Sequence, residues 1–164
     1  MGCALPWGRM MVSFDTNLAV YAMNTASEFH SSALGFMTSL AKRKDVVVCE
    51  LVLVELYLKL RNERIFPRPL SASQATAVCQ SYRQNRLWKI VEAAPVMENV
   101  WKSTGEENFA FRRIIDLRLA MTLLHSGVTH FATSNVRDFQ NLGFEKVWNP
   151  FLGEALKPPH GSGA

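Results

Sequence analysis

Short apolar runs alternate along this chain with longer segments in which apolar residues recur every three or four positions. The runs Met11–Phe14, Val46–Cys49 and Thr129–Thr133 have the length and composition of strands. Val46–Cys49 is apolar throughout, as expected of a strand that is covered on both faces. Between the runs lie helical patterns such as His30–Arg43 and Phe111–Ser126. Because parallel strands need long crossover connections, this alternation predicts a three-layer α/β/α fold with a mostly parallel central sheet of four to five strands.

The segment Glu50–Arg61 is a place where strand and helix are easily confused, because most of its residues are apolar. It is too long for a usual strand directly after another, and its leucine-rich composition favours a helix. Ser71 and Gln74 have the capping-box spacing that is typical of the start of a helix. Gly127 marks the end of the predicted helix Phe111–Ser126. The other predicted elements are helices at Leu18–Met23, Ser71 to about Asn85 and Met97–Lys102, strands at Leu87–Val91 and Glu145–Trp148, and a turn with a short helix at Ser134–Gln140.

The chain length of 164 residues suits a single core, and we predict one domain over residues 11–150. Residues 1–10 and 151–164 are expected to be irregular or disordered extensions. Residues 1–10 make a poor signal peptide, and no apolar run approaches the about 20 residues of a membrane span. Cys3, Cys49 and Cys79 have no metal-ligand spacing and cannot all pair, which fits a reducing cytoplasm. The net charge of +4 is compatible with a nucleic-acid partner.

Four acidic residues occupy corresponding places beside the predicted strands. Asp15 follows the first strand, Glu55 lies in the helix after the second, and Asp116 and Asp138 lie on either side of Thr129–Thr133. Strand ends and helix starts of a parallel sheet meet at one edge, where ligands bind. Carboxylates gathered there without histidine or cysteine repel one another unless cations neutralise them. Oxygen-only ligands suit Mg²⁺ or Mn²⁺, and a pair of such ions can activate water against a phosphodiester.

Each acid also has a purely structural interpretation. Asp15 is a favoured residue for capping the helix that begins near Leu18, and Asp116 would stabilise the first turn of its own helix. Pairing with an arginine would explain Glu55, and a solvated turn would explain Asp138. A shared site is favoured because all four acids, far apart in the sequence, fall at the same edge of the predicted sheet.

Four segments carry a resemblance to a known family. They are Phe14-Asp15-Thr16-Asn17, Leu53-Val54-Glu55-Leu56-Tyr57, Arg113-Ile114-Ile115-Asp116-Leu117-Arg118-Leu119-Ala120 and Ala132-Thr133-Ser134-Asn135-Val136-Arg137-Asp138-Phe139, and Val147-Trp148-Asn149-Pro150 also fits. With these segments in this order, the chain resembles PIN-domain ribonucleases of the VapC type, toxins of bacterial toxin–antitoxin pairs, over about residues 11–150. The resemblance implies a PIN-like fold and a divalent-metal endoribonuclease with Asp15, Glu55 and Asp116 as its acidic triad.

The resemblance defines the fourth acidic position less well. Many relatives carry an aspartate where Asn135 stands, whereas others have asparagine there and an acid three residues later, as Asp138 is here. We hypothesise that Asp15 and Asp116 bind a first Mg²⁺, with Mn²⁺ as the alternative. Glu55 would bridge through a water or bind a second ion, which Asp138 would help to hold. The residues assigned to the outer shell are Asn17, Thr133 and Asn135.

RNA that approaches an acidic centre needs positive charge around the rim. The candidates are the arginines that flank the acids in sequence, Arg112, Arg113, Arg118 and Arg137, although each is equally explained as a salt-bridge partner or a solvated charge. The resemblance further implies a cognate antitoxin and a homodimer. We expect an antitoxin segment to fit a groove between the helices Glu50–Leu60 and His30–Lys42, with ordinary core and a dimer surface as the competing interpretation.

Other classes of protein also place an aspartate after a first strand. A haloacid-dehalogenase-like phosphatase needs a second aspartate two residues later, where this chain has Asn17. A phosphate-accepting receiver domain needs an acidic pair after that strand and a central acceptor aspartate, and neither is visible. A PIN-like scaffold that binds RNA without cutting it stays open as an alternative, and incubation with RNA with and without Mg²⁺ separates it from a nuclease.

Overall fold

The computed structural model describes residues 9–153, which contain five short strands. The strands are β1 (Val12–Phe14), β2 (Val47–Cys49), β3 (Lys89–Val91), β4 (His130–Ala132) and β5 (Lys146–Trp148). All pairings are parallel, as predicted: β1 pairs with β4, β4 with β5, and β2 with β3. Of the predicted extensions at residues 1–10 and 151–164, residues 1–8, which include Cys3, and residues 154–164 lie outside the described residues.

The strands form two sheets, β1-β4-β5 and β2-β3, rather than the single continuous sheet that the sequence predicts. One parallel bridge, between Val12 and Val46, joins the β2–β3 ladder to β1, which gives the spatial order β3-β2-β1-β4-β5. Each strand is three residues long, so the twist of neighbouring strands leaves little length over which β1 and β2 can stay paired. Along the chain, β2 and β3 are added on one side of β1, whereas β4 and β5 are added on its other side. The carboxyl ends of β1 and β4 are therefore the topological switch point of the sheet.

The predicted helices are all present between the strands. They are α1 (Thr16–Met23), α2 (His30–Ala41), α3 (Glu50–Leu60), α4 (Ala72–Arg83), α5 (Met97–Thr104), α6 (Arg113–His125) and α7 (Val136–Phe139), and a short 3₁₀ helix η1 (Pro150–Leu152) follows β5. Ser71 and Gln74 form the predicted capping box at α4. Gly127 follows the C-cap residue of α6, Ser126, and adopts a φ of 86°, a conformation that favours glycine and ends the helix.

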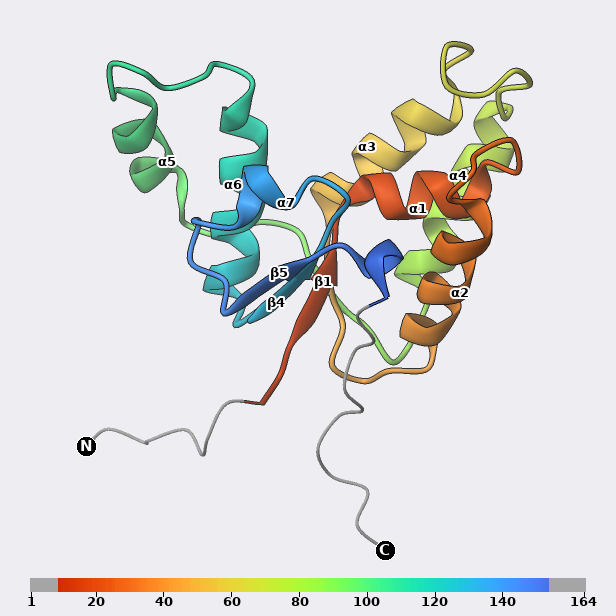
Figure 1. Cartoon of the computed structure of the whole chain (residues 1–164), viewed down its shortest axis with the longest axis horizontal. Coiled ribbons are helices and arrows are strands. Elements are labelled where there is room, and N and C mark those ends of the chain that lie inside the picture. Colours follow the sequence, from red (N-terminus) through yellow and green to blue (C-terminus); the bar gives the residue numbers. More distant parts are fainter. Residues whose placement is uncertain (1–8, 154–164) are drawn as a thin grey trace, which may run out of the picture.

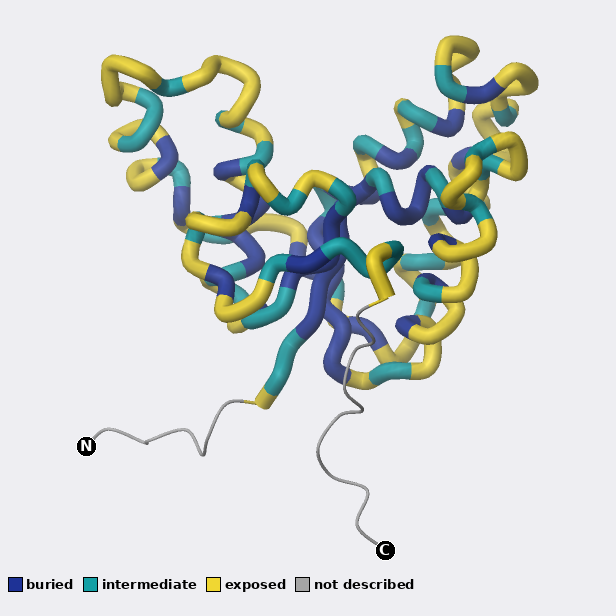
Figure 2. The backbone as a smooth tube through the Cα atoms, viewed as in Figure 1, coloured by how far each residue is buried: buried dark blue, intermediate teal, exposed yellow. Residues whose placement is uncertain are grey.

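The helices are divided between the two sides of the strands. Helices α1 to α4 lie on one side and α5 to α7 on the other, so that α3 and α6 face each other across the switch point (Figure 1). The strands at the centre of the molecule are buried, whereas the ends of the two helical arms are largely exposed (Figure 2). The carboxyl edge of the sheet therefore opens between the two arms.

Helix α6 packs on two sides, which the sequence did not indicate. The sequence places Ile114, Leu117, Met121 and Leu124 on one apolar stripe. The first three pack in a small second cluster with α5, whereas Leu124 packs against the main core, in which Leu119 and Leu123 are buried. A helix that lies between two apolar clusters needs apolar residues on more than one face. Packing on both sides fixes the orientation of the first turn of α6, where Asp116 lies.

Two further expectations concern membranes and disulfides. None of the helices within residues 9–153 combines the length and the apolar character that crossing a bilayer requires. Cys49 and Cys79 are both free cysteines in the described part of the chain.

Candidate active site

Asp15 lies at the switch point of the sheet. Its backbone N–H donates to the carbonyl oxygen of Ala132 (2.8 Å), so the ladder between β1 and β4 continues one residue beyond the strand. The side chain is buried, with 8% of its residue surface exposed, and it makes no capping hydrogen bond at the start of α1. It accepts a hydrogen bond from the hydroxyl of Thr133 (2.9 Å) instead. The capping interpretation of Asp15 is therefore not what the structure shows.

Thr133 fixes the orientation of the Asp15 carboxylate. Its backbone N–H donates to the carbonyl of Trp148 (3.0 Å), which anchors the residue directly after β4. Its hydroxyl oxygen accepts a hydrogen bond from the backbone N–H of Asn135 (2.9 Å), so the hydroxyl hydrogen is available for Asp15. The predicted outer-shell residue Asn135 thus acts here through its backbone, while the residue itself is exposed.

Glu55 points from α3 toward the start of α1. One carboxylate oxygen accepts a hydrogen bond from the buried hydroxyl of Thr16 (2.9 Å), and the other lies 3.0 Å from the ammonium of Lys59. That ammonium also donates to the side-chain oxygen of Asn17 (2.7 Å), a predicted outer-shell residue. The partner of Glu55 is thus a lysine on its own helix, not the arginine that the structural interpretation required.

Sequence analysis did not identify Thr16 or Lys59 as site residues. A glutamate followed four positions later by a lysine is a recognisable pair on a helix, so the spacing of Glu55 and Lys59 carried a signal for one of them. The role of Thr16 carried none, because its partner is 39 residues away.

The pKa of Asp116 is affected by the charges of the other three acids. Burial, as the largest cause, and the negative charges of Asp15, Asp138 and Glu55 together raise its pKa to about 6, while Arg113 acts in the opposite direction. Burial also raises the pKa of Asp15, Thr133 lowers it, and Glu55 raises it. Like charges have such effects only when they are close together. The structure therefore brings all four predicted acids to one region of the molecule.

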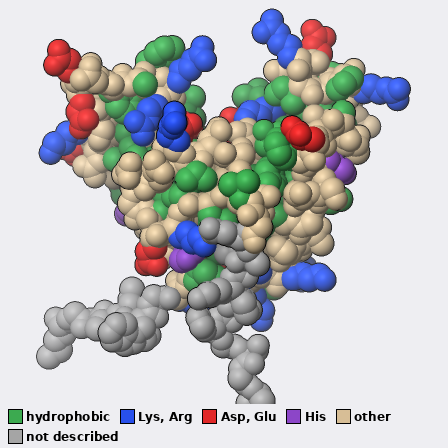
Figure 3. Space-filling view, in the orientation of Figure 1, with side chains coloured by type: hydrophobic (Ala, Val, Ile, Leu, Met, Phe, Trp, Pro, Cys, Tyr) green, Lys and Arg blue, Asp and Glu red, His purple; other side chains and the backbone are tan. Residues whose placement is uncertain are grey.

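Glu55 and Asp116 share a cleft of about 510 Å³ between α3, α5 and α6. The residues that line it are Leu51, Val54, Glu55, Leu58, Met97, Trp101, Ile114, Ile115, Asp116, Arg118 and Leu119. The acids are accompanied mainly by apolar side chains, several of which are strongly exposed, with Leu58 and Ile115 each at 62%. Figure 3 shows the molecule hollowed between its two helical arms, with Lys and Arg side chains on both of them.

The four acids offer oxygen atoms that suit a divalent ion, but their side chains are not gathered around a common point. Within residues 9–153, no three Asp, Glu, His or Cys side chains lie close enough together to hold a metal ion. Protein donors engage both oxygens of Glu55 and one oxygen of Asp15. All the acids offer oxygen ligands, which Mg²⁺ and Mn²⁺ prefer, and a cation would relieve their mutual repulsion. A bound ion would have to draw these side chains together.

The candidate RNA-binding arginines lie around this centre with different contacts. Arg112 stacks over the exposed ring of Phe111, with 5.5 Å between its guanidinium carbon and the ring centroid. Arg113 donates to the carbonyl oxygen of Asp138 (3.5 Å). Arg118 lines the cleft, and Arg137 is exposed on α7. All four arginines are exposed, so the structure leaves them accessible to a ligand.

The prediction of a groove between α3 and α2 is wrong. Helix α1 packs against both of them and separates them, and the exposed apolar residues Val54 and Leu58 of α3 face the cleft toward α5 and α6 instead. The sequence showed that α3 carries surplus apolar residues. It did not show which neighbour they would face.

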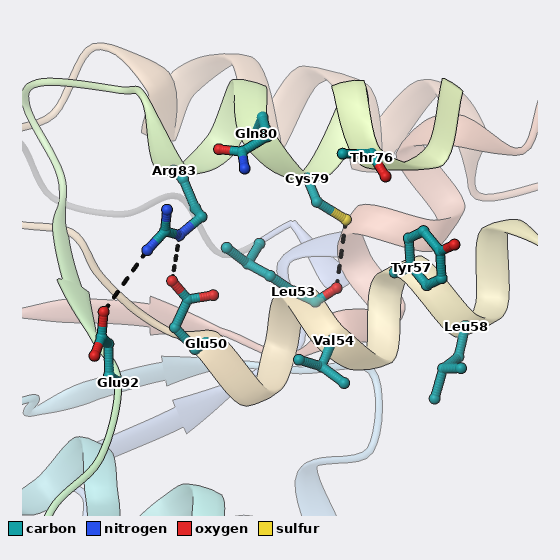
Figure 4. Close-up of a pocket in the computed structure, with 10 residues that line it drawn as sticks. All are labelled: Glu50, Leu53, Val54, Tyr57, Leu58, Thr76, Cys79, Gln80, Arg83 and Glu92. Carbon is teal, nitrogen blue, oxygen red and sulfur yellow. Dashed lines mark hydrogen bonds and ion pairs between the residues drawn. The ribbon is translucent and has the colours of Figure 1, made fainter. Parts of the chain in front are cut away.

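A second cavity, of about 530 Å³, lies between α3 and α4, apart from the acids (Figure 4). Its charged groups satisfy one another, because Arg83 pairs with Glu50 and also lies 3.7 Å from Glu92. The thiol of Cys79 donates to the carbonyl oxygen of Leu53 (3.4 Å). Glu50, the first residue of α3, therefore belongs to this cavity and not to the acidic centre.

Comparison with known proteins identifies relatives of the whole domain. No family model matches the chain. The chain is 46% identical over 144 residues to ribonuclease VapC24 of Mycobacterium tuberculosis, in strains CDC 1551 and H37Rv, covering 88% of this chain and 99% of that protein.

Solved structures show the same fold at much lower sequence identity. VapC20 of M. tuberculosis, a sarcin–ricin-loop-cleaving toxin, matches with a TM-score of 0.57 and 17% identity over 81% of this chain and 95% of its own. FitAcB of Neisseria gonorrhoeae matches with a TM-score of 0.58 and 18% identity (86% and 99%). VapBC2 of Rickettsia felis, bound to a promoter DNA fragment, matches with 0.57 and 15% (85% and 98%).

The raised pKa of Asp116 predicts an unusual pH dependence of stability. Its pKa of about 6 in the folded protein exceeds the ordinary value of 3.8, so the folded state binds a proton that the unfolded state lacks between these values. Stability of the metal-free protein therefore falls as the pH rises from about 4 to about 6. We expect Asp116→Asn to raise the unfolding free energy in EDTA at pH 7 by about 1–2 kcal/mol, and much less at pH 4, as measured by urea denaturation.

Asp45→Asn is the matched control for this measurement. Asp45 is buried and accepts hydrogen bonds from Arg43 at 2.8 and 2.5 Å, so its neutralisation should destabilise the protein at pH 7. An Asp116→Asn protein that is less stable than wild type at pH 7 in EDTA would show that Asp116 is a structural acid.

Proposed function

The chain belongs to the VapC family of PIN-domain ribonuclease toxins, and on that basis we propose that it is a Mg²⁺-dependent endoribonuclease that cleaves phosphodiester bonds in RNA. The family relationship rests on 46% identity over nearly the whole relative. The observation that supports the proposed chemistry is the electrostatic coupling of Asp116 with Asp15, Glu55 and Asp138. Four acids from separate segments, held close at the switch point of a parallel sheet, have few uses other than binding cations.

We assign the metal-binding roles to Asp15, Asp116, Glu55 and Asp138, with Asp15 and Asp116 as the principal ligands. A bound Mg²⁺, or Mn²⁺, would supply positive charge for the hydrolysis of the phosphodiester. Thr133 holds the Asp15 carboxylate in place through its hydroxyl, and Thr16 does the same for Glu55. Each carboxylate is thus held by a hydroxyl that is itself fixed at the start of a helix or the end of a strand.

The nuclease proposal predicts that the acids and the metal are both required for cleavage. We expect Asp15→Asn and Asp116→Asn each to reduce the rate of RNA cleavage more than about 100-fold, and EDTA to abolish cleavage until Mg²⁺ is restored. The measurement is a gel assay of purified protein with structured RNA. Glu63→Gln, which removes an exposed acid beyond the end of α3, is the control and should stay within about twofold of wild type.

Two results would decide against this proposal. Full cleavage by the Asp15→Asn protein would remove Asp15 from the active site. RNA binding by wild type without cleavage in Mg²⁺ or Mn²⁺ would favour the alternative, a PIN-like scaffold that binds RNA without cutting it.

We propose that Arg112, Arg113, Arg118 and Arg137 attract the RNA backbone to the acidic centre. If Arg112 contacts a phosphate, Arg112→Ala should weaken RNA binding and reduce the slope of log K against log salt by about 0.7, the value per phosphate of a single strand. Binding is measured by fluorescence anisotropy in the Asp15→Asn background, so that the RNA stays intact. Arg64→Ala, an exposed arginine in the loop after α3, is the control, and an equal effect of both changes would exclude a specific role for Arg112.

We further propose that the apolar cleft between α3, α5 and α6 receives a segment of a cognate antitoxin. Leu58, Trp101 and Ile115 are each more than 60% exposed, which is unusual for large apolar side chains in one cleft. An amphipathic helix that fills such a cleft buries these side chains. It would also cover Glu55 and Asp116, and a basic residue on it would find the acids as its partners.

Co-purification tests the antitoxin proposal. The protein encoded by the reading frame directly upstream should co-purify with the tagged wild-type chain, and Leu58→Glu should abolish this association because it places a charge on the apolar wall. Leu34→Glu, an exposed leucine of α2 away from the cleft, should leave it intact. Retention of the complex by the Leu58→Glu protein would exclude this cleft.

A homodimer and a cytoplasmic location also stay predictions. Sedimentation velocity measures the oligomeric state, and cell fractionation measures the location.

A further inference from the structure

Lys59 is held inside the acidic centre. Its ammonium lies 3.0 Å from a carboxylate oxygen of Glu55 and donates to the side-chain oxygen of Asn17 at 2.7 Å. Its side chain is 24% exposed, so it is largely withdrawn from solvent. Lysine ammonium groups are strongly hydrated, and two short contacts with protein oxygens indicate a built position rather than a solvated charge. The mechanism described above assigns no role to this cation.

Both carboxylate oxygens of Glu55 already have a protein partner in this arrangement. The Thr16 hydroxyl occupies one oxygen and the Lys59 ammonium the other. Glu55 is also the acid to which a second divalent ion would have to bind, because Asp15 and Asp116 are the principal ligands of the first. A dication placed at Glu55 would therefore either displace the ammonium or repel it at close range.

We propose that the ammonium of Lys59 takes the place of a second divalent ion at Glu55, so that the centre binds one divalent ion, at Asp15 and Asp116. The inference rests on the proposed function and narrows the metal-binding roles assigned there, because Glu55 and Asp138 then hold no second ion of their own. Lys59 is then a positioning residue: it neutralises one acid permanently, orients Asn17, and leaves a single ion to be acquired from solution. Its charge also acts favourably on the neighbouring Asp15.

Counting bound Mn²⁺ tests the proposal directly. Equilibrium dialysis of the purified full chain, with Mn²⁺ quantified by electron paramagnetic resonance, should give one ion per wild-type chain and two per Lys59→Met chain. Lys59→Arg keeps the positive charge and should stay at one. Lys44→Met, which removes an exposed lysine after α2, is the matched control and should also stay at one. Two ions in wild type, or one in the Lys59→Met protein, would overturn the proposal.

Thermal melting without metal gives a second, independent measurement. In EDTA, Lys59→Met should lower the melting temperature by about 2–4 °C, because it leaves the acids without their internal cation. In the Glu55→Gln background the same change should have less than half that effect. Equal effects in both backgrounds would show that Lys59 does not act through Glu55.

Cleavage of RNA separates this proposal from the proposed function. If the Mn²⁺ count rises from one to two as expected but wild type does not cut RNA, the role of Lys59 stands and the nuclease does not. If wild type cuts RNA and binds two ions, the nuclease stands and the role of Lys59 does not. A wild-type chain that binds no Mn²⁺ would overturn both.

Discussion

Repulsion among like charges is the interaction around which this structure is arranged. Burial and the neighbouring charges of Asp15, Glu55 and Asp138 raise the pKa of Asp116 to about 6, and Asp15 is almost fully buried. Buried carboxylates at short range destabilise a folded domain unless other groups compensate. The compensation comes from local donors at two acids, with a hydroxyl at each and an ammonium at Glu55. The negative charge that these donors leave uncompensated can attract a cation.

The parallel sheet makes this arrangement possible because it fixes the backbone around the acids. The β1–β4 ladder continues to Asp15, and the β4–β5 ladder to Thr133. Both residues are therefore anchored by backbone hydrogen bonds at the same edge, and the side-chain bond between them needs little further ordering. The strand order reverses at this point, which separates the helical layers and leaves the carboxyl edge open between α3 and α6.

The cleft combines an acidic part and an apolar part, which suit different ligands. Its acids and the arginines around them suit a metal ion and the phosphates of a nucleic acid, whereas Leu58, Trp101 and Ile115 suit an apolar protein segment. Because both parts line one opening, a protein segment that fills the apolar part covers Glu55 and Asp116 as well. Steric exclusion alone would then be enough to inhibit the site.

The sequence by itself determined the α/β class, the order and approximate limits of the helices and strands, and the edge at which the four acids meet. These follow from periodicity, propensity and the geometry of parallel strands, which are local or general rules. Only the tertiary structure decided that the strands form two sheets, that the surplus apolar residues of α3 face α5 and α6, and that Thr133, Thr16 and Lys59 hold the acids. Two of these contacts join residues 118 and 39 positions apart, so they depend on how whole elements pack, which no short pattern of residues records.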